Sequence, residues 1–367
     1  MTQSDPAAGG VRGLAGGPDP DGITGPRTAR PLSNVTYVLP LKSAAPVSDK
    51  DFIEYLGWLA DKMPVIVADG SEPAVFAAHR SQWGGAVHHL AVTSRTLNGK
   101  VAGVCDGVAA AQTPYVTIAD DDVRYDDAAL HAVASLLLSH DVVVPQNYFS
   151  PMRWHTHWDT GRTLINRALR ADYAGTIALR RDAFEETAGY CGAVLFENLE
   201  LMRTLQAHGF AVHHARNVFV ARRPPTARHF LGQRVRQAYD SFAQPWRLSL
   251  QLALLPLISL LTSRSRALPV AAAAAAIGTA EYGRRRYGGS RVFSPLSSVS
   301  APLWLLERAV CSWLAVGCFL RGGVRYAGRR LACAAHTTSR LSTSTCPESR
   351  CQCGIALRST APLGTRA

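Results

Sequence analysis

The sequence lacks several features that would place it in a class at once. Its first 33 residues contain no compact apolar run of the signal-peptide kind, so we expect no secretion. No module of interleaved aromatic and basic residues is present, so we expect no nucleic-acid partner. Each of its apolar segments is also short for a membrane span of roughly 20 residues. We therefore expect a chain that is not secreted, in which two apolar segments form a tight hairpin or lie partly in the membrane interface.

The cysteines of this chain show neither a disulfide pattern nor a standard zinc spacing. Eight are scattered along the sequence, which suits a reducing compartment. A zinc site near the end of the chain stays an alternative, although its surroundings are rich in Ser, Thr and Arg. We predict free buried thiols at Cys105, Cys191, Cys311 and Cys318, and the alternative zinc ligands are Cys346, Cys351 and Cys353 with His336 upstream.

Composition divides the chain into four parts. Residues 1–33 are rich in Gly, Pro, Ala and Asp and predict a disordered leader. Residues 34–246 carry the alternating pattern of a catalytic domain, residues 247–330 are largely apolar, and residues 331–367 predict a disordered basic tail. The formal charge is +12, and much of the excess follows Ala221, near the apolar segments. Basic residues in that place indicate contact with an anionic membrane face.

Strand and helix patterns alternate through the first half of the catalytic part. This alternation predicts an α/β fold with a doubly wound, mostly parallel sheet. The expected strands are Val35–Leu39, Val65–Ala68, Val87–Val92, Tyr115–Ile118 and Val142–Pro145, followed by Ala211–His214 and Val218–Val220. The expected helices include one capped by Ser48, Asn98–Ala111, Asp127–Leu138 capped by Asp126, Leu164–Leu169 and Phe196–His208.

The C-terminal half turns basic and then apolar. An amphipathic basic helix is expected over about 229–242, either along a bilayer surface or packed against the catalytic core, and both can hold. Arginine clusters near 284–286 and 321–330 should stay cytosolic, which favours an even number of spans or an interfacial segment. A helical domain whose buried faces resemble spans is the soluble alternative. The apolar segments are Leu248–Leu261, Leu268–Ala280 and Pro302–Leu320.

The most informative local feature is the aspartate triplet Asp120–Asp122 at the end of an apolar strand. Stacked carboxylates repel one another, but a hard divalent cation between them and a diphosphate would make them compatible. Oxygen ligands favour Mg²⁺ or Mn²⁺. Ligands of α/β sheets usually bind at such strand ends. The alternative is a solvated turn in which Asp122 or Asp126 caps the next helix.

Six motifs occur in one order along this chain. This order resembles that of family 2 glycosyltransferases with a GT-A fold, particularly membrane-attached ones similar to ceramide glucosyltransferases. The resemblance covers about residues 34–242 and, less specifically, the apolar segments. The motifs are Val65–Ser71, Asn98–Gly103 with Gly107, the triplet Asp120–Asp122, Gly175-Thr176 before Arg180-Arg181, Glu197-Asn198, and Gln233–Gln237 in place of a Gln-x-x-Arg-Trp motif.

The resemblance implies a role for each matching residue. Asp69 would contact the nucleotide base and Lys100 would approach the nucleotide. Asp120 and Asp122 would hold Mg²⁺ or Mn²⁺ on the sugar-nucleotide diphosphate, and an outer acid such as Asp120 would bind either the metal or the ribose. The remaining expectations are Gln233 and Arg236 on the diphosphate and Gly175 and Thr176 on the acceptor side.

The motif for the catalytic base departs from the family pattern. The family has Glu-Asp where this chain has Glu197-Asn198, and an asparagine cannot usefully accept a proton. We therefore expect Glu197 to be the base, with Glu200 one helical turn along as the alternative. His155 and His157 flank Thr156 and either line the acceptor entrance or are simply loop residues.

These features together predict an inverting, metal-dependent glycosyltransferase. It would move a sugar from a nucleotide-sugar donor to a lipid or lipid-linked acceptor, with its catalytic domain on the cytosolic side of the cell membrane. The departure at Asn198 supports an alternative, a non-catalytic membrane scaffold that keeps the sugar-nucleotide pocket. A nucleotidyltransferase is a third alternative, but Pro40–Ser43 is a poor phosphate loop.

Overall fold

The structure is a computed structural model that describes residues 32–342 except residues 84, 171, 173 and 327. The expected leader therefore lies almost wholly outside the described residues. The same holds for Cys346, Cys351 and Cys353 and hence for the alternative zinc site. Cys105, Cys191 and Cys311 are buried thiols, as expected, and Cys318 is a thiol that is only half-buried.

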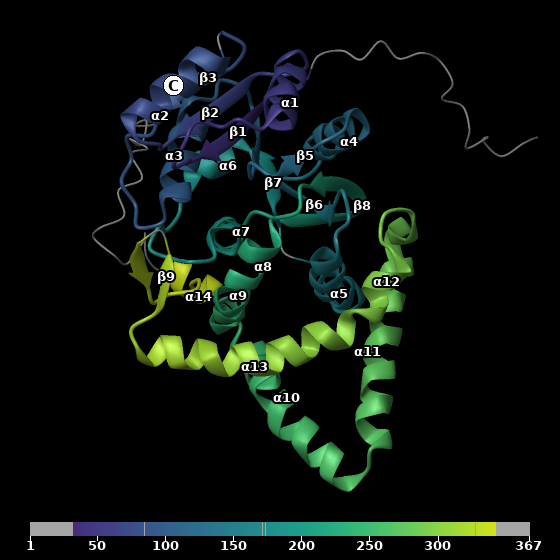
Figure 1. Ribbon diagram of the computed structural model, residues 1–367. Helices are drawn as coiled ribbons and strands as arrows, with labels where there is room; N and C mark the ends of the chain where they lie inside the picture. Colours follow the sequence, from purple (N-terminus) through teal and green to yellow (C-terminus); the bar gives the residue numbers. More distant parts are fainter. Residues whose placement is uncertain (1–31, 84, 171, 173, 327, 343–367) are drawn as a thin grey trace, which may run out of the picture. The chain divides into compact units, whose positions relative to one another are not determined.

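An eight-stranded sheet forms the centre of the catalytic part, with the strand order β3-β2-β1-β4-β7-β6-β8-β5 (Figure 1). The run from β3 to β4 is parallel, and β6 and β8 are also parallel neighbours. The predicted α/β fold with a mostly parallel sheet is thus confirmed. The strands are β1 (Val35–Leu41), β2 (Val65–Asp69), β3 (His88–Ala91), β4 (Tyr115–Ala119), β5 (Val123–Arg124), β6 (Val142–Phe149), β7 (Thr176–Arg180) and β8 (Val212–Arg222).

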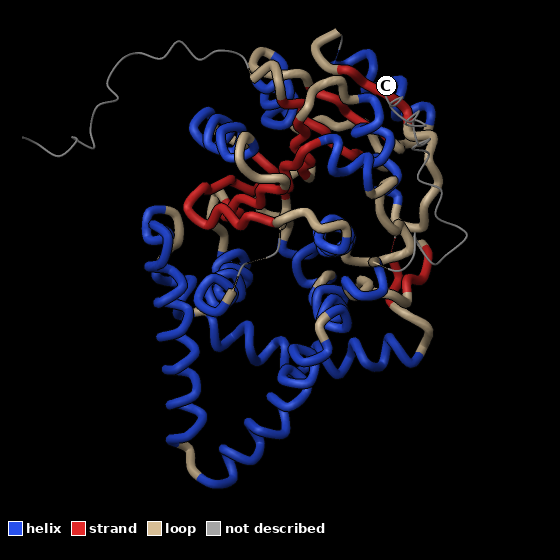
Figure 2. Tube along the Cα trace, turned by 180° about the vertical axis from the view of Figure 1, so that it is seen from behind, coloured by secondary structure: helices blue, strands red, loops and turns tan. Residues whose placement is uncertain are grey.

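Helices cover both faces of this sheet, as Figure 2 shows from behind. One apolar cluster joins the sheet to α1 and α4, and a second joins it to α3, α6 and α7. Burial on both faces explains why the central strands read as continuous apolar runs. The helices are α1 (Lys50–Ala60), α2 (Pro73–Trp83), α3 (Gly99–Ala110), α4 (Asp127–Leu137), α6 (Arg181–Glu186) and α7 (Glu197–Ala207).

Short polar side chains cap the N-termini of three of these helices. Asn98 caps α3 by accepting the Lys100 backbone N–H at 3.2 Å. Asp126 caps α4 as predicted, accepting the Ala129 N–H at 2.8 Å. Asp49 rather than Ser48 caps α1, because the Asp49 carboxylate accepts the Asp51 N–H at 3.1 Å. Each cap satisfies an otherwise unpaired donor of the first turn.

Two antiparallel pairings shape the end of β4. Strand β7 runs antiparallel to β4 and places Thr176 opposite Ala119. Strand β5 pairs with β8 and places Val123 opposite Arg222. These pairings bring residues from distant parts of the sequence to the carboxyl end of β4, where the aspartate triplet lies.

Two elements of the middle region differ from the sequence-based expectation. Helix α5 (Trp154–Leu169) begins ten residues earlier than the predicted helix and contains both His155 and His157, which were expected in an extended or loop segment. Polar residues such as Asp159 occupy its buried face, so an apolar periodicity could not reveal it. The two strands expected near 211–220 are one strand, β8.

The basic amphipathic segment is a broken helix. Helix α8 (Ala227–Gly232) ends at Gln233 and α9 (Arg234–Tyr239) follows, with a short 3-10 turn over Asp240–Ala243. Phe230 and Arg234 are both buried, so the segment packs against the rest of the protein. The expected packing against the core is confirmed, and its contact with a bilayer stays a prediction.

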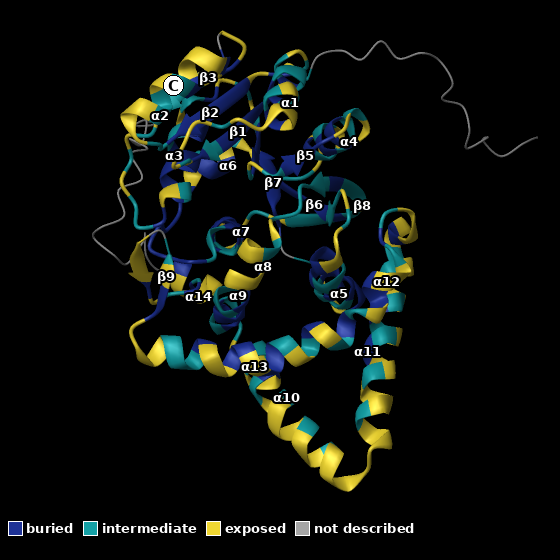
Figure 3. Cartoon of the chain, viewed as in Figure 1, coloured by how far each residue is buried: buried dark blue, intermediate teal, exposed yellow. Residues whose placement is uncertain are grey.

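The apolar segments form long helices whose outer surfaces are exposed (Figure 3). Two of them, Pro245–Arg264 and Pro295–Leu320, are long and apolar enough to cross a membrane by length and composition. Within the described residues the third segment does not meet that standard, which agrees with an even number of spans. The helices are α10 (Pro245–Arg264), α11 (Ala267–Arg285), α12 (Pro295–Val299) and α13 (Ala301–Leu320), with a 3-10 turn over Arg286–Arg291.

The ordered chain continues past the expected start of the tail at residue 331. A hairpin of β9 (Val324–Tyr326) and β10 (Arg329–Leu331) is followed by α14 (Thr338–Leu341). His336 and Leu341 are buried there. The segment is held because His336 binds Glu200 of α7, a contact that composition alone cannot show.

Candidate functional site

The acid corner, which we define as Asp120, Asp121 and Asp122, directly follows β4. Lys100, in the first turn of α3, places its Nζ 2.5 Å from Oδ1 of Asp120. The same Nζ lies 2.7 Å from Oε1 of Glu197. Burial alone would lower the pKa of Lys100, but the charges of Asp120 and Glu197 outweigh it and raise the pKa above its ordinary value. Lys100 is therefore a permanent cation at the centre of the site.

Arg222 at the end of β8 is the second cation of the acid corner. Its Nε donates to Oδ1 of Asp122 at 3.0 Å, and its Nη2 donates to Oδ2 of the same residue at 2.7 Å. Nη2 also reaches Oδ2 of Asp120 at 3.4 Å. Although burial opposes its charge, the carboxylates of Asp122 and Asp120 raise the pKa of Arg222. The bidentate geometry fixes the orientation of the Asp122 carboxylate.

The charge balance of this corner fits a divalent cation. The three aspartates and Glu197 supply more negative charge than Lys100 and Arg222 can neutralise. Carboxylate oxygens are the donors that Mg²⁺ and Mn²⁺ prefer. Asp120 and Asp122 both point into the same cavity, so they fit the predicted role of metal ligands.

Glu197 and Asn198 begin α7 and face Lys100, but they are held differently. Glu197 receives Lys100 Nζ and, at 3.4 Å, the side-chain amide of Asn98. The Asn198 amide nitrogen donates to the Ala174 carbonyl at 2.9 Å, which anchors it in the wall. Glu197 and Asn198 both line the cavity, and the Asn198 side-chain oxygen also lies 3.4 Å from Lys100 Nζ. The role of Glu197 as the catalytic base stays a prediction.

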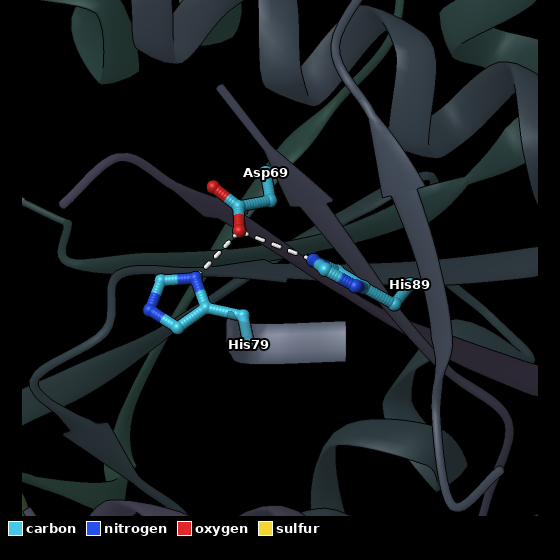
Figure 4. A group of neighbouring side chains, drawn as sticks. All are labelled: Asp69, His79 and His89. Carbon is cyan, nitrogen blue, oxygen red and sulfur yellow. Dashed lines mark hydrogen bonds and ion pairs between the residues drawn. The ribbon is translucent and has the colours of Figure 1, made fainter. Parts of the chain in front are cut away.

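Asp69 lies behind the cavity wall, between two histidines (Figure 4). Its Oδ2 is 2.7 Å from Nδ1 of His79 and 3.1 Å from Nε2 of His89, and its Oδ1 accepts the Ser71 N–H at 2.9 Å. The carboxylate is buried, and Gly70 lines the cavity beside it. Contact of Asp69 with a nucleotide base stays a prediction; in this packing the side chain shapes the Gly70 turn.

Asp69, His79 and His89 form a triad whose ligand atoms lie close enough together to hold a metal ion. The Val47 backbone N–H, however, donates to Nε2 of His79 at 3.0 Å. The proton of a neutral His79 must then lie on Nδ1, where it is donated to Asp69. The triad therefore has the pattern of a hydrogen-bond network that supports the end of β2.

Gly175 and Thr176 lie behind the acid corner at the start of β7. The Gly175 N–H donates to the side chain of Asn147 at 2.8 Å, and a Cβ at this position would lie 2.9 Å from the Arg222 guanidinium. The Thr176 hydroxyl donates to the Ile118 carbonyl at 2.8 Å. Both residues thus support Arg222 and β4, and their predicted role on the acceptor side stays a prediction.

One cavity of about 1080 Å³ is lined by Lys100, the acid corner, Glu197, Asn198 and Arg222. It extends from the acid corner past Gln233 and Arg236 to side chains of α10 and α13, among them Gln251 and Arg308. Gln233 stands at the break between α8 and α9, and the Arg236 guanidinium lies over the Tyr326 ring at 5.3 Å. Both residues therefore line the cavity, and their contact with the diphosphate stays a prediction.

Asp240, one turn beyond Arg236, lines the same cavity. Burial, helped by the nearby charge of Glu197, raises the pKa of Asp240 to about 7. The protonated form of this carboxyl group is therefore more favoured than in an ordinary aspartate. Sequence reasoning missed Asp240, because it lies in an ordinary amphipathic pattern.

Sequence reasoning also missed Arg222 and the buried network around Arg234. Arg234 Nη1 lies 3.0 Å from Oδ1 of Asp159 and 3.4 Å from Oε2 of Glu307. These contacts join α5, α9 and α13 below the cavity. The available signal for Arg222 was the pair of arginines that ends the β8 pattern; Asp159 was hidden by the misplaced start of α5.

The middle of the chain, residues 61–196, matches the profile of the family described as Glycosyl transferase family 2. The matched segment includes Lys100, the acid corner and Gly175-Thr176, and it ends one residue before Glu197. The matched residues therefore line one side of the cavity, and Glu197, Arg222 and Arg236 line it from outside the match.

Several solved structures have similar folds. One is a mannosyltransferase from Pyrobaculum calidifontis in complex with GDP-Man and Mn²⁺, which is 18% identical over 80% of this chain and 90% of that chain, with a TM-score of 0.46. Another is a glucosyl-3-phosphoglycerate synthase from Mycobacterium tuberculosis in complex with Mn²⁺, UDP-glucose and phosphoglyceric acid, which is 16% identical over 55% of this chain and 75% of that chain, with a TM-score of 0.36. No curated protein matches the chain.

Proposed function

We propose that the protein is an inverting, metal-dependent glycosyltransferase that uses a nucleotide-sugar donor and a lipid or lipid-linked acceptor at the cytosolic membrane face. The observation that carries this proposal is the continuity of one cavity. It runs from the acid corner, in the glycosyltransferase domain, to Gln251 of α10 and Trp304 of α13. In the described part of the chain, α10 and the segment Pro295–Leu320 that contains α13 are long and apolar enough to cross a membrane. Donor chemistry and an apolar acceptor can therefore meet in a single space.

The donor side of the proposal depends on charge. Negative charge grows on the diphosphate as the bond between the anomeric carbon and its leaving oxygen breaks. Lys100 and Arg236 line the cavity and can contact phosphate oxygens, and a guanidinium suits them in particular. A divalent metal held by Asp120 and Asp122 would supply Lewis-acid neutralisation of the departing diphosphate.

The acceptor side depends on Glu197. As the acceptor oxygen forms its bond to the anomeric carbon, its proton must go to a base. Glu197 is the carboxylate that faces the cavity at the position next to Asn198, and Lys100 and Asn98 hold it in place. In this proposal the proton moves to Glu197, and the nucleoside diphosphate leaves with the electron pair of the broken bond.

One observation favours a second candidate, the non-catalytic scaffold. The carboxylates of Asp120 and Asp122 are already paired with Lys100 and Arg222, and Asn198 replaces the usual acid. Such a protein would bind the donor and leave it intact. The two candidates therefore differ in turnover and agree in donor binding.

The experiment is a panel of nucleotide sugars incubated with the purified full chain in neutral detergent, with Mn²⁺ or Mg²⁺ and a membrane lipid extract. We expect release of nucleoside diphosphate from at least one donor. Asp122→Asn should abolish this release while keeping the fold, because it weakens both the metal site and the Arg222 contact. The matched control is Asp182→Asn, since Asp182 is exposed and pairs with Arg180 on the surface.

The outcomes separate the candidate functions. Donor binding without release indicates the scaffold, and pyrophosphate release from a nucleoside triphosphate indicates the nucleotidyltransferase. Transfer to a water-soluble acceptor but not to lipid would contradict the acceptor class and leave the glycosyltransferase reaction in place. Retained turnover in Asp122→Asn would contradict the role given to the acid corner.

A further inference from the structure

A second cavity, here called the basic groove, has a volume of about 820 Å³ and is lined by residues of α8, α9, the end of α13 and the β9–β10 hairpin. Its lining includes no aspartate or glutamate among the described residues. This composition differs from that of the central cavity, where acidic residues lie between the basic ones. The basic side chains that line the groove are Arg228, His229, Arg236, Arg321, Arg325 and Arg330.

The arginines of the basic groove have no carboxylate partners within the described part of the chain. Arg321 and Arg330 instead donate to backbone carbonyl groups, at 3.3 Å to Gly317 and 2.9 Å to Gly323. These bonds hold two guanidinium groups near the groove without neutralising them. Like charges gathered in one concavity raise the local potential and attract an anion.

The position of the groove indicates where that anion comes from. Helix α13, the last part of a segment able to cross a membrane, ends at Leu320, and Arg321 follows it directly. Phe319 and Leu320 are large, apolar and exposed, Leu320 to 78%. A membrane helix that ends in exposed apolar residues and continues into arginines places those arginines at the level of the lipid headgroups.

We propose that the basic groove binds the phosphate headgroup of an anionic membrane lipid. This inference depends on the membrane association that is part of the proposed function. The guanidinium groups of Arg321 and Arg325 would contact the phosphate oxygens, which match their planar fork of donors. The acyl chains would lie along the exposed apolar end of α13. A free phosphate or a nucleotide would leave that apolar surface uncovered.

The groove also has a functional position, because His229, Gln233 and Arg236 line both the basic groove and the central cavity. A lipid headgroup in the groove would therefore lie beside the α8–α9 break that borders the donor site. The lipid would fix the distance between this break and the bilayer, and with it the entry of a membrane-borne acceptor.

The test uses the full chain in neutral detergent and titrates it with short-chain dihexanoyl phosphatidic acid. Dihexanoyl phosphatidylcholine and inorganic phosphate are the comparison ligands. We expect phosphatidic acid to bind more tightly than either. The double variant Arg321→Gln/Arg325→Gln should weaken that binding about thirtyfold, since each basic residue near an anionic lipid surface contributes a roughly fivefold effect.

The matched control is the double variant Lys50→Gln/Arg80→Gln, which removes the same charge from exposed positions on α1 and α2. It should bind phosphatidic acid as the parent does. Equal binding of the two lipids, an unchanged groove variant, or inorganic phosphate binding as tightly as phosphatidic acid would each overturn the inference. Calorimetry of nucleotide-sugar binding in the same samples reports on the proposed function separately, because neither arginine belongs to the donor site.

Discussion

Lys100 joins Asp120 to Glu197: its Nζ lies 2.5 Å from one carboxylate and 2.7 Å from the other. The residue predicted to hold the metal and the residue predicted to take the proton thus share one cation. Any cation that approaches Asp120 competes with this ammonium group, while the ammonium group keeps two nearby carboxylates from repelling each other.

Replacing Lys100 with methionine should therefore separate metal binding from turnover. We expect Lys100→Met to bind Mn²⁺ more tightly in the absence of donor, because Asp120 loses its competing partner. Turnover should fall about a hundredfold, the usual effect of losing one group that stabilises a developing charge. Calorimetric titration with Mn²⁺ and initial rates of nucleoside diphosphate release measure the two effects. Lys50→Met, an exposed change on α1, is the control, and unchanged turnover in Lys100→Met would contradict the assignment.

The choice between Glu197 and Asn198 can be tested by exchanging acid and amide. Glu197→Gln should lower kcat by about 10²- to 10⁴-fold with little change in KM for the donor, as expected for loss of a general base. Glu186→Gln, an exposed change on α6, should leave both constants unchanged. Initial rates measured across a range of donor concentrations give kcat and KM separately.

Asn198→Asp is the reciprocal change. It removes the amide hydrogen that Asn198 donates to the Ala174 carbonyl and places a carboxylate against that oxygen. We expect a loss of about 1–3 kcal/mol in the free energy of unfolding and no gain in turnover. A faster Asn198→Asp enzyme, together with an active Glu197→Gln enzyme, would show that the base belongs at position 198.

The contact between Glu200 and His336 predicts a pH-dependent stability. Hydrogen bonds to the Cys333 sulfur and to the Glu200 carboxylate raise the pKa of His336 to about 10, from an ordinary value of 6.5. The stabilisation that comes from a charged His336 is therefore complete below pH 6.5 and is lost as the pH rises through about 10. We expect the Tm to fall over this window, and His336→Gln should remove that part of the fall.

His88→Gln, an exposed change on β3, is the control for this pH series. Asp240 titrates in a different window, because its raised pKa of about 7 replaces an ordinary value of 3.8. The stability linked to protonated Asp240 is lost between those two values, so the two effects separate along the pH axis. A Tm profile of His336→Gln that matches the parent between pH 6.5 and 10 would contradict the role of this contact.

The sequence was sufficient to predict those elements whose burial and local hydrogen bonds both follow from neighbouring residues. β1, β2 and β4 are apolar because both of their faces are covered, and Asn98 and Asp126 cap their helices through contacts two or three residues away. The acid corner could also be predicted from the local sequence, because its three aspartates directly follow one apolar strand. Local signals of this kind need no knowledge of the rest of the chain.

The rest of the site depends on contacts between distant residues. Arg222 reaches Asp122 across 100 positions, through the antiparallel pairing of β5 and β8. Glu200 and His336 are 136 positions apart, which is why the tail appeared disordered. The start of helix α5 was missed because its buried face carries Asp159 and other polar groups. Asp159 is paired with Arg234 of α9 as well as with Arg162 of α5 itself. The hydrophobic periodicity of one segment contains no information about which distant residue will pair with its polar side chains.

The close packing of α11 on α5 gives a last prediction, about the attachment of the apolar helices. A Cβ added at Gly283 would lie 1.9 Å from the Leu164 carbonyl oxygen and 2.9 Å from the Ala168 nitrogen. These are backbone atoms of α5, so they cannot rotate away. We expect Gly283→Ala to push the two helices apart and to cost about 3 kcal/mol of unfolding free energy.

Gly278→Ala is the control on the same helix, because no atom lies within 4 Å of its added Cβ. Its Tm should be unchanged or slightly higher, since alanine favours a helix over glycine by about 1 kcal/mol. Equal Tm values for the two variants would mean that α11 does not rest on α5 as the structure has it.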